Sequence, residues 1–308
     1  SLNYIKNSDN KISSFLTIQE GCDKFCKFCV VPYTRGAEFS RSIDELVRES
    51  KQLVSNGSKE ITLLGQNVNA YNYEGKKLSD LILEISQIGE LKRIRYTTSH
   101  PRDFTEDLIK AHKDCEKLMP LIHLPVQSGS NKILGNMNRK HKIEEYLEIV
   151  EKLKNIKPGL KFSSDFIIGY PGESDGDFKQ TLELMKKVEF INSYSFIYSA
   201  RPGTPAFSLK KINDNVSKER LNVFQNLAKK IKTHYKETLL TKTVLVLFEN
   251  KIKNENKYFG RDEHFNSVIV ESNENLIGKI KDIKITKCNH NTLFGEAISN
   301  FKEENFAA

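Results

Sequence analysis

Long apolar runs and internal repeats are absent from the sequence. No segment approaches the ~20 consecutive apolar residues that a membrane-spanning helix needs, and no secretory signal peptide is recognisable at the start of the chain. These absences argue against a transmembrane protein and a repeat array. We therefore expect a soluble, cytoplasmic protein that has no membrane partner.

Cysteine is scarce as well, and its count is odd. The five cysteines cannot all pair as disulfides. Without an export signal, their thiols are expected to stay reduced and available for metal. Three of them, Cys22, Cys26 and Cys29, fall within eight residues. The fourth cysteine that would complete a compact metal site is missing from that stretch.

Acidic residues are fewer than basic ones. Lysine and arginine total 48 against 40 aspartates and glutamates, a formal net charge of +8. Such an excess favours a nucleic-acid partner, and an ordinary lysine-rich surface is the alternative. Residues 209–237 hold eight Lys or Arg against three Asp or Glu. The basic density therefore lies late in the chain, where it could follow a phosphate backbone.

From residue 14 onward, short β-branched or apolar runs alternate with amphipathic helical patterns. This alternation is typical of βα units around a parallel sheet. The six candidate strands are SFLTIQ, EITLLG, RIRYTT, LIHLP, FSSDFIIG and NSYSFIYS. Residues 1–13 are polar and contain turn formers, which predicts a leading linker before a large domain over residues 14–239.

Three helices are indicated by apolar residues that recur every three or four positions. The first follows Ser42, which forms a capping box with Glu45, and Gly57 ends it. The other two are expected over about 142–154 and 217–239. The last of them closes the large domain.

After Thr241 the long helical patterns give way to short alternating runs. Asn, Gly and charged turns separate TVLVLFE, YFGRD, SVIVE, IGKIKDIKIT and LFGEAIS. This texture predicts a small all-β barrel over residues 240–302 and a tail at 303–308. Five-stranded barrels often bind oligonucleotides, and others serve only as scaffolds. Phe259 and Phe265 are candidates for base stacking, with core packing as the more ordinary role.

The three clustered cysteines follow the pattern C-x-x-x-C-x-x-C directly after the first predicted strand. Soft thiolates bind zinc, copper or iron–sulfur clusters. A structural zinc site is normally closed by four ligands, whereas three ligands on a four-iron cluster leave one iron open. Buried unligated cysteines, or a zinc completed by a distant histidine, are the alternatives. Cys115 and Cys288 are isolated in sequence, and we expect both to serve in packing.

The cysteine spacing, with Phe28 before the last cysteine, resembles the signature of radical S-adenosylmethionine (SAM) enzymes. The strings EGCDKFCKFCVVPYTRGAEFSR, LLGQNVNAY, TTSHP, LPVQSGS and RPGTPA are similar to the methylthiotransferase family, and most of all to its tRNA-modifying isopentenyladenosine branch. The resemblance implies an α/β fold, namely a partial (β/α)6 barrel that holds the cluster, followed by a TRAM domain. The TRAM domain is a small OB-like barrel that binds RNA.

The resemblance also implies which side chains bind SAM. Gly65, Gln66 and Asn67 follow the second strand, where many radical SAM enzymes carry Gly-Gly-Glu to receive the amino group of SAM. The positions that face its ribose, carboxylate and adenine are Gln127, Ser128, Asp165 and Ile168. The three thiolates of Cys22, Cys26 and Cys29 are expected to hold one 4Fe–4S cluster whose open iron binds SAM.

The activity implied is methylthiolation of N6-isopentenyladenosine at position 37 of tRNA, beside the anticodon. The reduced cluster would split SAM into methionine and a 5′-deoxyadenosyl radical, which removes hydrogen from carbon 2 of the adenine. That carbon is unactivated, so a radical cofactor is needed. The expected partners are tRNA and an electron donor such as flavodoxin or ferredoxin, and the chain is expected to be a monomer.

Two other functions remain open at the level of the sequence. One is methylthiolation of threonylcarbamoyl-adenosine or of a ribosomal protein, and the other is a non-catalytic RNA-binding protein with a structural zinc. Full-length members of the family carry three more cysteines for a second 4Fe–4S cluster. We expect this chain to be a fragment that is competent at most for SAM binding and cleavage.

Overall fold

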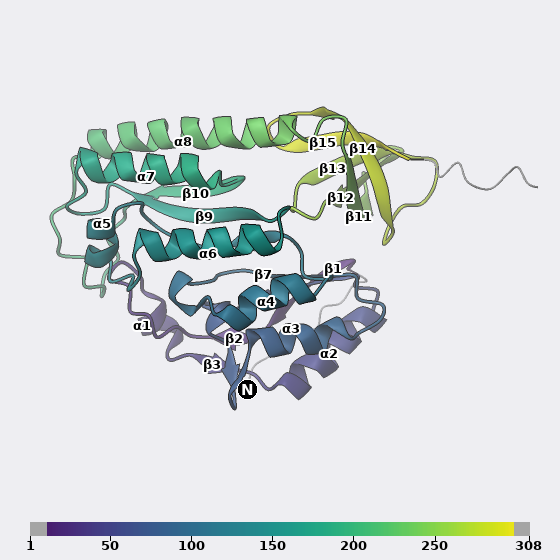
Figure 1. Cartoon of the computed structure of the whole chain (residues 1–308), viewed down its shortest axis with the longest axis horizontal. Helices are drawn as coiled ribbons and strands as arrows, with labels where there is room; N and C mark the ends of the chain where they lie inside the picture. The colour runs from purple at the N-terminus through teal and green to yellow at the C-terminus, as the bar shows by residue number, and fades with distance from the viewer. Residues whose placement is uncertain (1–10, 299–308) are drawn as a thin grey trace, which may run out of the picture. The chain divides into compact units, whose positions relative to one another are not determined.

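The structure is a computed structural model that describes residues 11–298. Most of the predicted linker and all of the predicted tail lie outside the described residues. The chain falls into two compact units that divide between Lys232 and Thr233. Helix α8 (Asp214–Glu237) runs through this division, so the predicted domain boundary after residue 239 falls slightly later (Figure 1).

All six predicted strands of the large unit are present. They are β1 (Ser13–Thr17), β4 (Glu60–Leu64), β7 (Arg93–Tyr96), β8 (Leu121–His123), β9 (Lys161–Ile168) and β10 (Asn192–Ile197). They form two three-stranded parallel sheets, ordered β1-β4-β7 and β10-β9-β8. A parallel bridge between Ile94 and Leu118 links β7 to the segment that leads into β8. The edges of this six-stranded wall are β1 and β10.

Helices cover one face of the wall, and α3, α4 and α6 lie in front of the strands in Figure 1. The helices before α8 are α1 (Val31–Arg35), α2 (Ile43–Ser55), α3 (Leu78–Ser86), α4 (Glu106–Asp114), α5 (Asn131–Asn136), α6 (Ile143–Ile156) and α7 (Asp175–Val188). Ser42 caps α2 by accepting a hydrogen bond from the Glu45 amide, which is one of the two bonds of the predicted capping box, while the Glu45 carboxylate accepts from Arg41 at 2.8 Å. The core between helices and strands includes fully buried Leu16, Ile61 and Phe166.

Short elements connect the strands to the helices. Two small antiparallel pairs join β2 (Gln19–Glu20) to β3 (Phe39–Ser40) and β5 (Asn72–Tyr73) to β6 (Lys76–Lys77). Single 3₁₀ turns occupy Val68–Ala70 and Pro101–Asp103. None of the described helices has the length and apolar character needed to cross a bilayer.

The second unit contains the closed barrel that the sequence predicts. Its strands are β11 (Thr243–Lys251), β12 (Lys257–Arg261), β13 (Ser267–Glu271), β14 (Ile280–Cys288) and β15 (Thr292–Ala297). They close in the order β11-β12-β13-β15-β14, with only the β13–β15 pair parallel. Cys288 ends β14, while Cys115 is a buried residue at the end of α4 in the first unit.

A buried ion pair fixes α8 to the loop that follows β9. The Arg220 guanidinium donates to the Glu173 carboxylate at 2.8 Å and to the Glu173 carbonyl oxygen at 3.1 Å. The Glu173 side chain is 1% exposed, and it also accepts a hydrogen bond from the Gly169 amide. Burial raises the pKa of the Glu173 carboxyl, and its hydrogen bonds to Gly169 and Arg220 oppose that shift.

Removing Arg220 should therefore destabilise the large unit strongly. Arg220→Ala would leave the Glu173 carboxylate buried without its counter-charge, at a cost of about 3 kcal/mol in the free energy of unfolding. Asp175 binds the same guanidinium at 2.7 Å but its side chain is 97% exposed, so Asp175→Ala is the matched control. Urea denaturation of the metal-free chain measures both variants. Equal unfolding midpoints for the two would contradict this account.

Candidate metal centre

The three clustered cysteines lie on the loop between β2 and α1. Gly21 opens this loop with φ +74°, and a Cβ there would collide with the Ala37 carbonyl oxygen, so only glycine fits. The Cys22 amide donates a hydrogen bond to the Gly36 carbonyl at 3.2 Å, which joins the start of the loop to the residue after α1. The sequence thus folds into a tight turn that presents the cysteines beside the end of β1.

The three thiols differ in exposure. Cys26 is 6% exposed, and Cys22 and Cys29 are half-buried. Burial raises the pKa of Cys22 to about 11 and moves the pKa of Cys29 upward as well. Metal-binding cysteines must be thiolates, so these residues release protons when they bind metal.

Segments far along the chain hold the backbone of this loop. The Lys27 amide donates to the Met137 carbonyl at 2.9 Å, and the Asn138 side chain donates to the Phe25 carbonyl at 2.9 Å. From the other side, the Ala206 amide donates to the Lys27 carbonyl at 2.9 Å. The RPGTPA motif therefore braces the cysteine loop, while Arg201 itself is exposed.

Arg139 is a site residue that the sequence analysis missed. Its side chain is 5% exposed, and its Nη1 donates to Cys26 Sγ at 3.5 Å while its Nη2 donates to the Pro125 carbonyl at 2.5 Å. Met137 and Asn138, which hold the loop, directly precede it. Arg139 follows a short helix and belongs to no periodic sequence pattern. Its partner Cys26 lies 113 residues earlier in the chain, so no local pattern connects the two residues.

The GQN segment after β4 packs against the cysteine loop. The Gln19 side-chain carbonyl accepts hydrogen bonds from the Gln66 and Asn67 amides at 3.0 Å each, and Gln66 Oε1 accepts from the Gly21 amide at 2.7 Å. A Cβ at Gly65 would lie 2.7 Å from the Gln19 carbonyl oxygen, so glycine permits this close approach. The segment directly follows β4, the second predicted strand, and these contacts brace the loop.

Two of the residues predicted to contact SAM, Asp165 and Ile168, lie on opposite faces of β9, and the other two, Gln127 and Ser128, follow β8. Asp165 is half-buried, with its carboxylate 3.5 Å from His123 Nε2. Gln127 adopts φ +74° and pairs with β9 through the Asp165 carbonyl at 2.9 Å. Gln127 and Asp165 are thus brought together at the end of β8.

Ser128 and Ile168 point elsewhere. Ile168 is fully buried in the core that faces the helices. Ser128 is 1% exposed, and its hydroxyl accepts from the Ser130 amide and contacts the Thr181 hydroxyl. The half-buried Ile167, rather than Ile168, shares a face with Asp165.

Several buried polar atoms near the cysteine loop lack a hydrogen-bond partner among the described residues. They are Asn67 Oδ1, His100 Nε2, Arg139 Nε and His141 Nε2. The rings of His100 and His141 meet edge to face, with centroids 5.8 Å apart. Burial lowers the pKa of both imidazoles, that of His141 to about 4, so both are neutral. Buried polar atoms are rarely left unpaired, which fits a polar cofactor at this position.

The donor set is one that an iron–sulfur cluster accepts. Within residues 11–298, no three His, Cys, Asp or Glu side chains are arranged to share one ion. A four-iron cluster does not require its ligands to converge on one ion, because each thiolate binds a different iron. Three thiols on one braced loop, with an arginine beside Cys26 and no carboxylate hydrogen-bonded to them, match the soft ligands that such a cluster takes.

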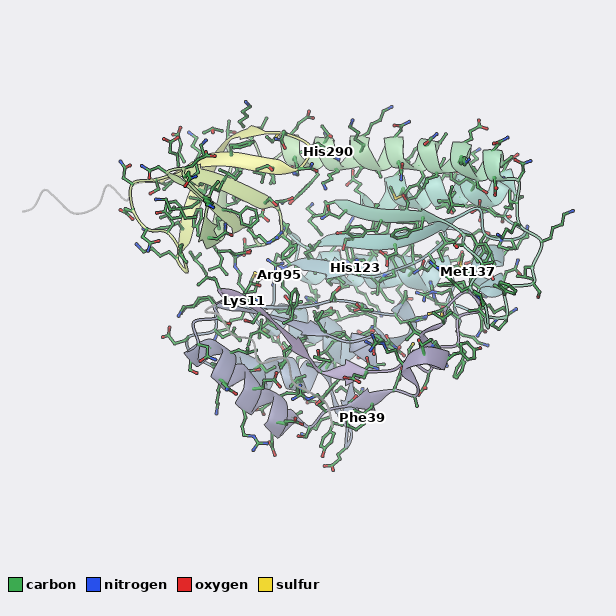
Figure 2. All side chains as sticks on the ribbon, turned by 180° about the vertical axis from the view of Figure 1, so that it is seen from behind. Lys11, Phe39, Arg95, His123, Met137 and His290 are labelled. Atoms are coloured by element: carbon green, nitrogen blue, oxygen red, sulfur yellow. The ribbon has the colours of Figure 1, made fainter. Side chains whose placement is uncertain are left out.

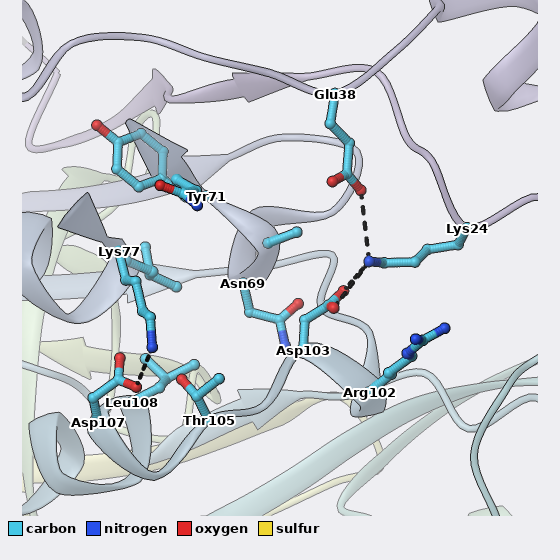
Figure 3. Close-up of a pocket in the computed structure, with 13 residues that line it drawn as sticks. Lys24, Glu38, Asn69, Tyr71, Lys77, Arg102, Asp103, Thr105, Asp107 and Leu108 are labelled. Atoms are coloured by element: carbon cyan, nitrogen blue, oxygen red, sulfur yellow. Dashed lines mark hydrogen bonds and ion pairs between the residues drawn. The ribbon is translucent and has the colours of Figure 1, made fainter. Parts of the chain in front are cut away.

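A polar pocket of about 310 Å³ lies beside the cysteine loop (Figure 3). Lys24 of the loop reaches into it and contacts the carboxylates of Asp103 at 2.8 Å and Glu38 at 4.0 Å. Lys77 and Asp107 form a second ion pair at 3.1 Å on the pocket wall. The Lys24–Asp103 pair ties the loop to the 3₁₀ turn that follows β7, and the Lys77–Asp107 pair joins β6 to α4.

The radical SAM superfamily matches residues 16–185 of this chain, and the TRAM domain matches residues 237–298. Among solved structures, coproporphyrinogen III oxidase from Escherichia coli superimposes with a TM-score of 0.56 at 13% identity, over 94% of this chain and 73% of that one. The radical SAM methyltransferase TsrM from Kitasatospora setae gives 0.54 at 15% identity, over 63% and 38%. At these identities the likeness concerns the fold alone.

Closer relatives are proteins named tRNA-2-methylthio-N(6)-dimethylallyladenosine synthase. The one from Pelagibacter ubique is 56% identical over 98% of this chain and 69% of its own length. The one from Rickettsia akari is 50% identical over 93% of this chain and 66% of its own length. The chain thus spans about two thirds of the relatives that it matches. It belongs to the radical SAM superfamily and, within it, to this family of tRNA methylthiotransferases.

Proposed function

We propose that this chain provides the SAM-cleaving and tRNA-binding parts of an enzyme that methylthiolates N6-isopentenyladenosine beside the tRNA anticodon. The observation that carries the proposal is the braced loop of three cysteines at the strand ends of a radical SAM fold. Close relatives are named for the N(6)-dimethylallyladenosine reaction, which concerns the same nucleoside.

Cys22, Cys26 and Cys29 would hold three irons of a 4Fe–4S cluster and leave the fourth iron to SAM. When bound, the cluster and SAM supply radical chemistry, which can remove a hydrogen atom from an unactivated base carbon. The Arg139 guanidinium donates a hydrogen bond to Cys26 Sγ at 3.5 Å, which helps to fix the position of this ligand.

Polar groups near the loop are available to orient SAM. Gln127 and Asp165 supply an amide and a carboxylate at the end of β8, within the same hydrogen-bonded segment. Asn67 retains an unpaired side-chain oxygen. Gly65 and Gln66 shape the approach of the β4 end to the loop, whereas Ser128 and Ile168 support the site from the core side.

The TRAM barrel is proposed to bind tRNA. Arg261 lies against Phe259 and Phe265, with its guanidinium carbon 5.2 Å and 4.1 Å from the two ring centroids. Phe265 is 39% exposed, so packing in the barrel core does not explain the position of its ring. An arginine flanked by aromatic rings offers planar surfaces on which unpaired bases stack.

The remaining functions are distinguished by simple observations. A non-catalytic protein with a structural zinc would be colourless, whereas an iron–sulfur protein purified without oxygen is brown. Methylthiolation of threonylcarbamoyl-adenosine or of a ribosomal protein finds no support in the names of the relatives. We propose further that the chain is monomeric and receives electrons from a flavodoxin or ferredoxin.

Replacing any one of the three loop cysteines should abolish the cluster. In Cys22→Ala, Cys26→Ala or Cys29→Ala, one iron loses its thiolate, so we expect loss of full iron content and of SAM cleavage. Cys115→Ala is the matched control, because Cys115 is buried at the end of α4, away from the loop. Iron analysis and 5′-deoxyadenosine quantitation test this. Full iron in any loop variant would disprove the assignment.

The 308 residues alone should bind one cluster and cleave SAM without methylthiolation. Beyond the loop they contain only Cys115 and Cys288, which lie in different units. A second cluster is expected in the part of the longer relatives that this chain does not match. Iron and sulfide analysis of the reconstituted chain, with mass spectrometry of tRNA nucleosides, tests this proposal. About eight irons per chain, twice the content of one four-iron cluster, or any methylthio product would overturn it.

Removal of residues 241–308 should weaken tRNA binding. The segment from 241 to 300 carries nine basic and eight acidic residues, so much of its contribution should come from stacking and shape. The affinity should fall while most of the salt dependence remains with the basic α8 helix. Titration of fluorescent tRNA at several salt concentrations measures both quantities. Unchanged affinity with an unchanged salt slope would show that the barrel does not bind tRNA.

A further inference from the structure

The segments that follow β4 and β7 are joined side by side at the polar pocket. The Asn69 side chain donates to the His100 carbonyl at 2.8 Å and accepts from the His100 amide at 2.8 Å. This reciprocal pair holds the 3₁₀ turn after β4 against the one after β7. Asp103, on the second turn, thereby comes within hydrogen-bonding distance of Asn67, which directly precedes the first turn.

The side-chain amide of Asn67 is held in one orientation. Its Nδ2 lies 2.8 Å from Asp103 Oδ2 and 3.1 Å from Glu38 Oε1. An ionised carboxylate only accepts hydrogen bonds, so the group between these two oxygens must be the NH2 end of the amide. The oxygen end, Oδ1, therefore points away from both carboxylates. Asn67 is 2% exposed, and its Oδ1 has no hydrogen-bond partner among residues 11–298.

The neighbouring Gln66 is in a different situation. Its Oε1 accepts a hydrogen bond from the Gly21 amide at 2.7 Å, at the start of the cysteine loop. Of the two side-chain amides proposed to receive the amino group of SAM, Asn67 is thus the one whose oxygen lacks a partner in the described structure. A buried acceptor without a donor costs free energy and is rare. An amino group supplies the N–H that this oxygen lacks.

A lysine balances the two carboxylates that hold Asn67. Lys24 Nζ lies 2.8 Å from Asp103 and 4.0 Å from Glu38, and these three side chains are between 18% and 20% exposed (Figure 3). Glu38 directly precedes Phe39 of β3, which lies near the lower edge of the view in Figure 2. Two carboxylates on one amide group would repel each other without a cation beside them. Because Lys24 belongs to the cysteine loop, this network links the loop to the amide.

We propose that Asp103 is a positioning residue for SAM. Its bond to Nδ2 holds the Asn67 amide so that Oδ1 is free to accept a hydrogen bond from the amino group of SAM, and Glu38 and Lys24 support this arrangement. Asp103 itself does not touch the cofactor. An amide that is already oriented loses less conformational freedom when SAM binds, and the affinity rises accordingly. The inference rests on the proposed function and deepens it.

Binding of SAM to the cluster-loaded chain tests the proposal. Asp103→Ala leaves Asn67 with only the longer bond to Glu38, so we expect the affinity for SAM to fall by roughly tenfold, the effect of one hydrogen bond to a charged group. The cleavage rate at saturating SAM should change much less, because the bond acts on binding. Asp107→Ala is the matched control. Asp107 is a carboxylate of the same pocket that pairs with a different lysine, Lys77, and its removal should leave the affinity for SAM unchanged.

A double-mutant cycle separates positioning from a general structural role. If Asp103 acts through Asn67, Asp103→Ala should cause little further loss of SAM affinity in a chain that already carries Asn67→Ala. Asp103→Asn keeps an acceptor oxygen and should retain more affinity than Asp103→Ala. Iron analysis of the loaded variants and urea denaturation of the metal-free variants are measured alongside, and both should resemble those of Asp107→Ala.

The positioning role would be overturned by unchanged SAM affinity in Asp103→Ala, by an equal loss in Asp107→Ala, or by a full additional loss in the double variant. Loss of iron in both Asp103→Ala and Asp103→Asn would overturn it as well, because Asp103 would then serve the cysteine loop through Lys24. If the unaltered chain held a cluster but did not bind SAM, the proposed function and the positioning role would both fail.

Discussion

Three backbone hydrogen bonds to one short loop underlie the whole site. Gly36 closes the cysteine loop on itself, Met137 holds it from the side of α5, and Ala206 holds it from the segment after β10. These bonds fix the backbone that carries Cys22, Cys26 and Cys29, which we propose as the ligands of the cluster. These bonds come from segments that are far apart in sequence, so the loop depends on the packing of α5 and of the segment after β10.

The two faces of the six-stranded wall differ in what they contact. One face packs against helices, where the buried pair of Glu173 and Arg220 fastens α8. The other face keeps His123 and Asp165 partly exposed beside the cysteine loop and carries aromatic rings at its edges. Most of the buried apolar contacts therefore lie on the outer face, and the inner face is more exposed.

The elements themselves were predictable from the sequence, because β-branched runs and helical periodicity are local signals. The cysteine loop was also predictable from its spacing. The alternation in FSSDFIIG also indicates that Phe166 and Ile168 share the apolar face and Asp165 lies on the other, so the expectation that both Asp165 and Ile168 face SAM did not use this signal. Arg139 and the bracing role of Ala206 were missed for a different reason. Their contacts with the loop are tertiary, and no local pattern encodes them.

The central claim is that Cys22, Cys26 and Cys29 hold a cluster with one iron open to SAM. Electron paramagnetic resonance of the reduced, reconstituted chain tests it most directly, with spectra recorded before and after SAM is added. If SAM binds the open iron, its amino and carboxylate groups change the ligands of that iron, and the spectrum of the reduced cluster must change. Identical spectra at saturating SAM would contradict the account.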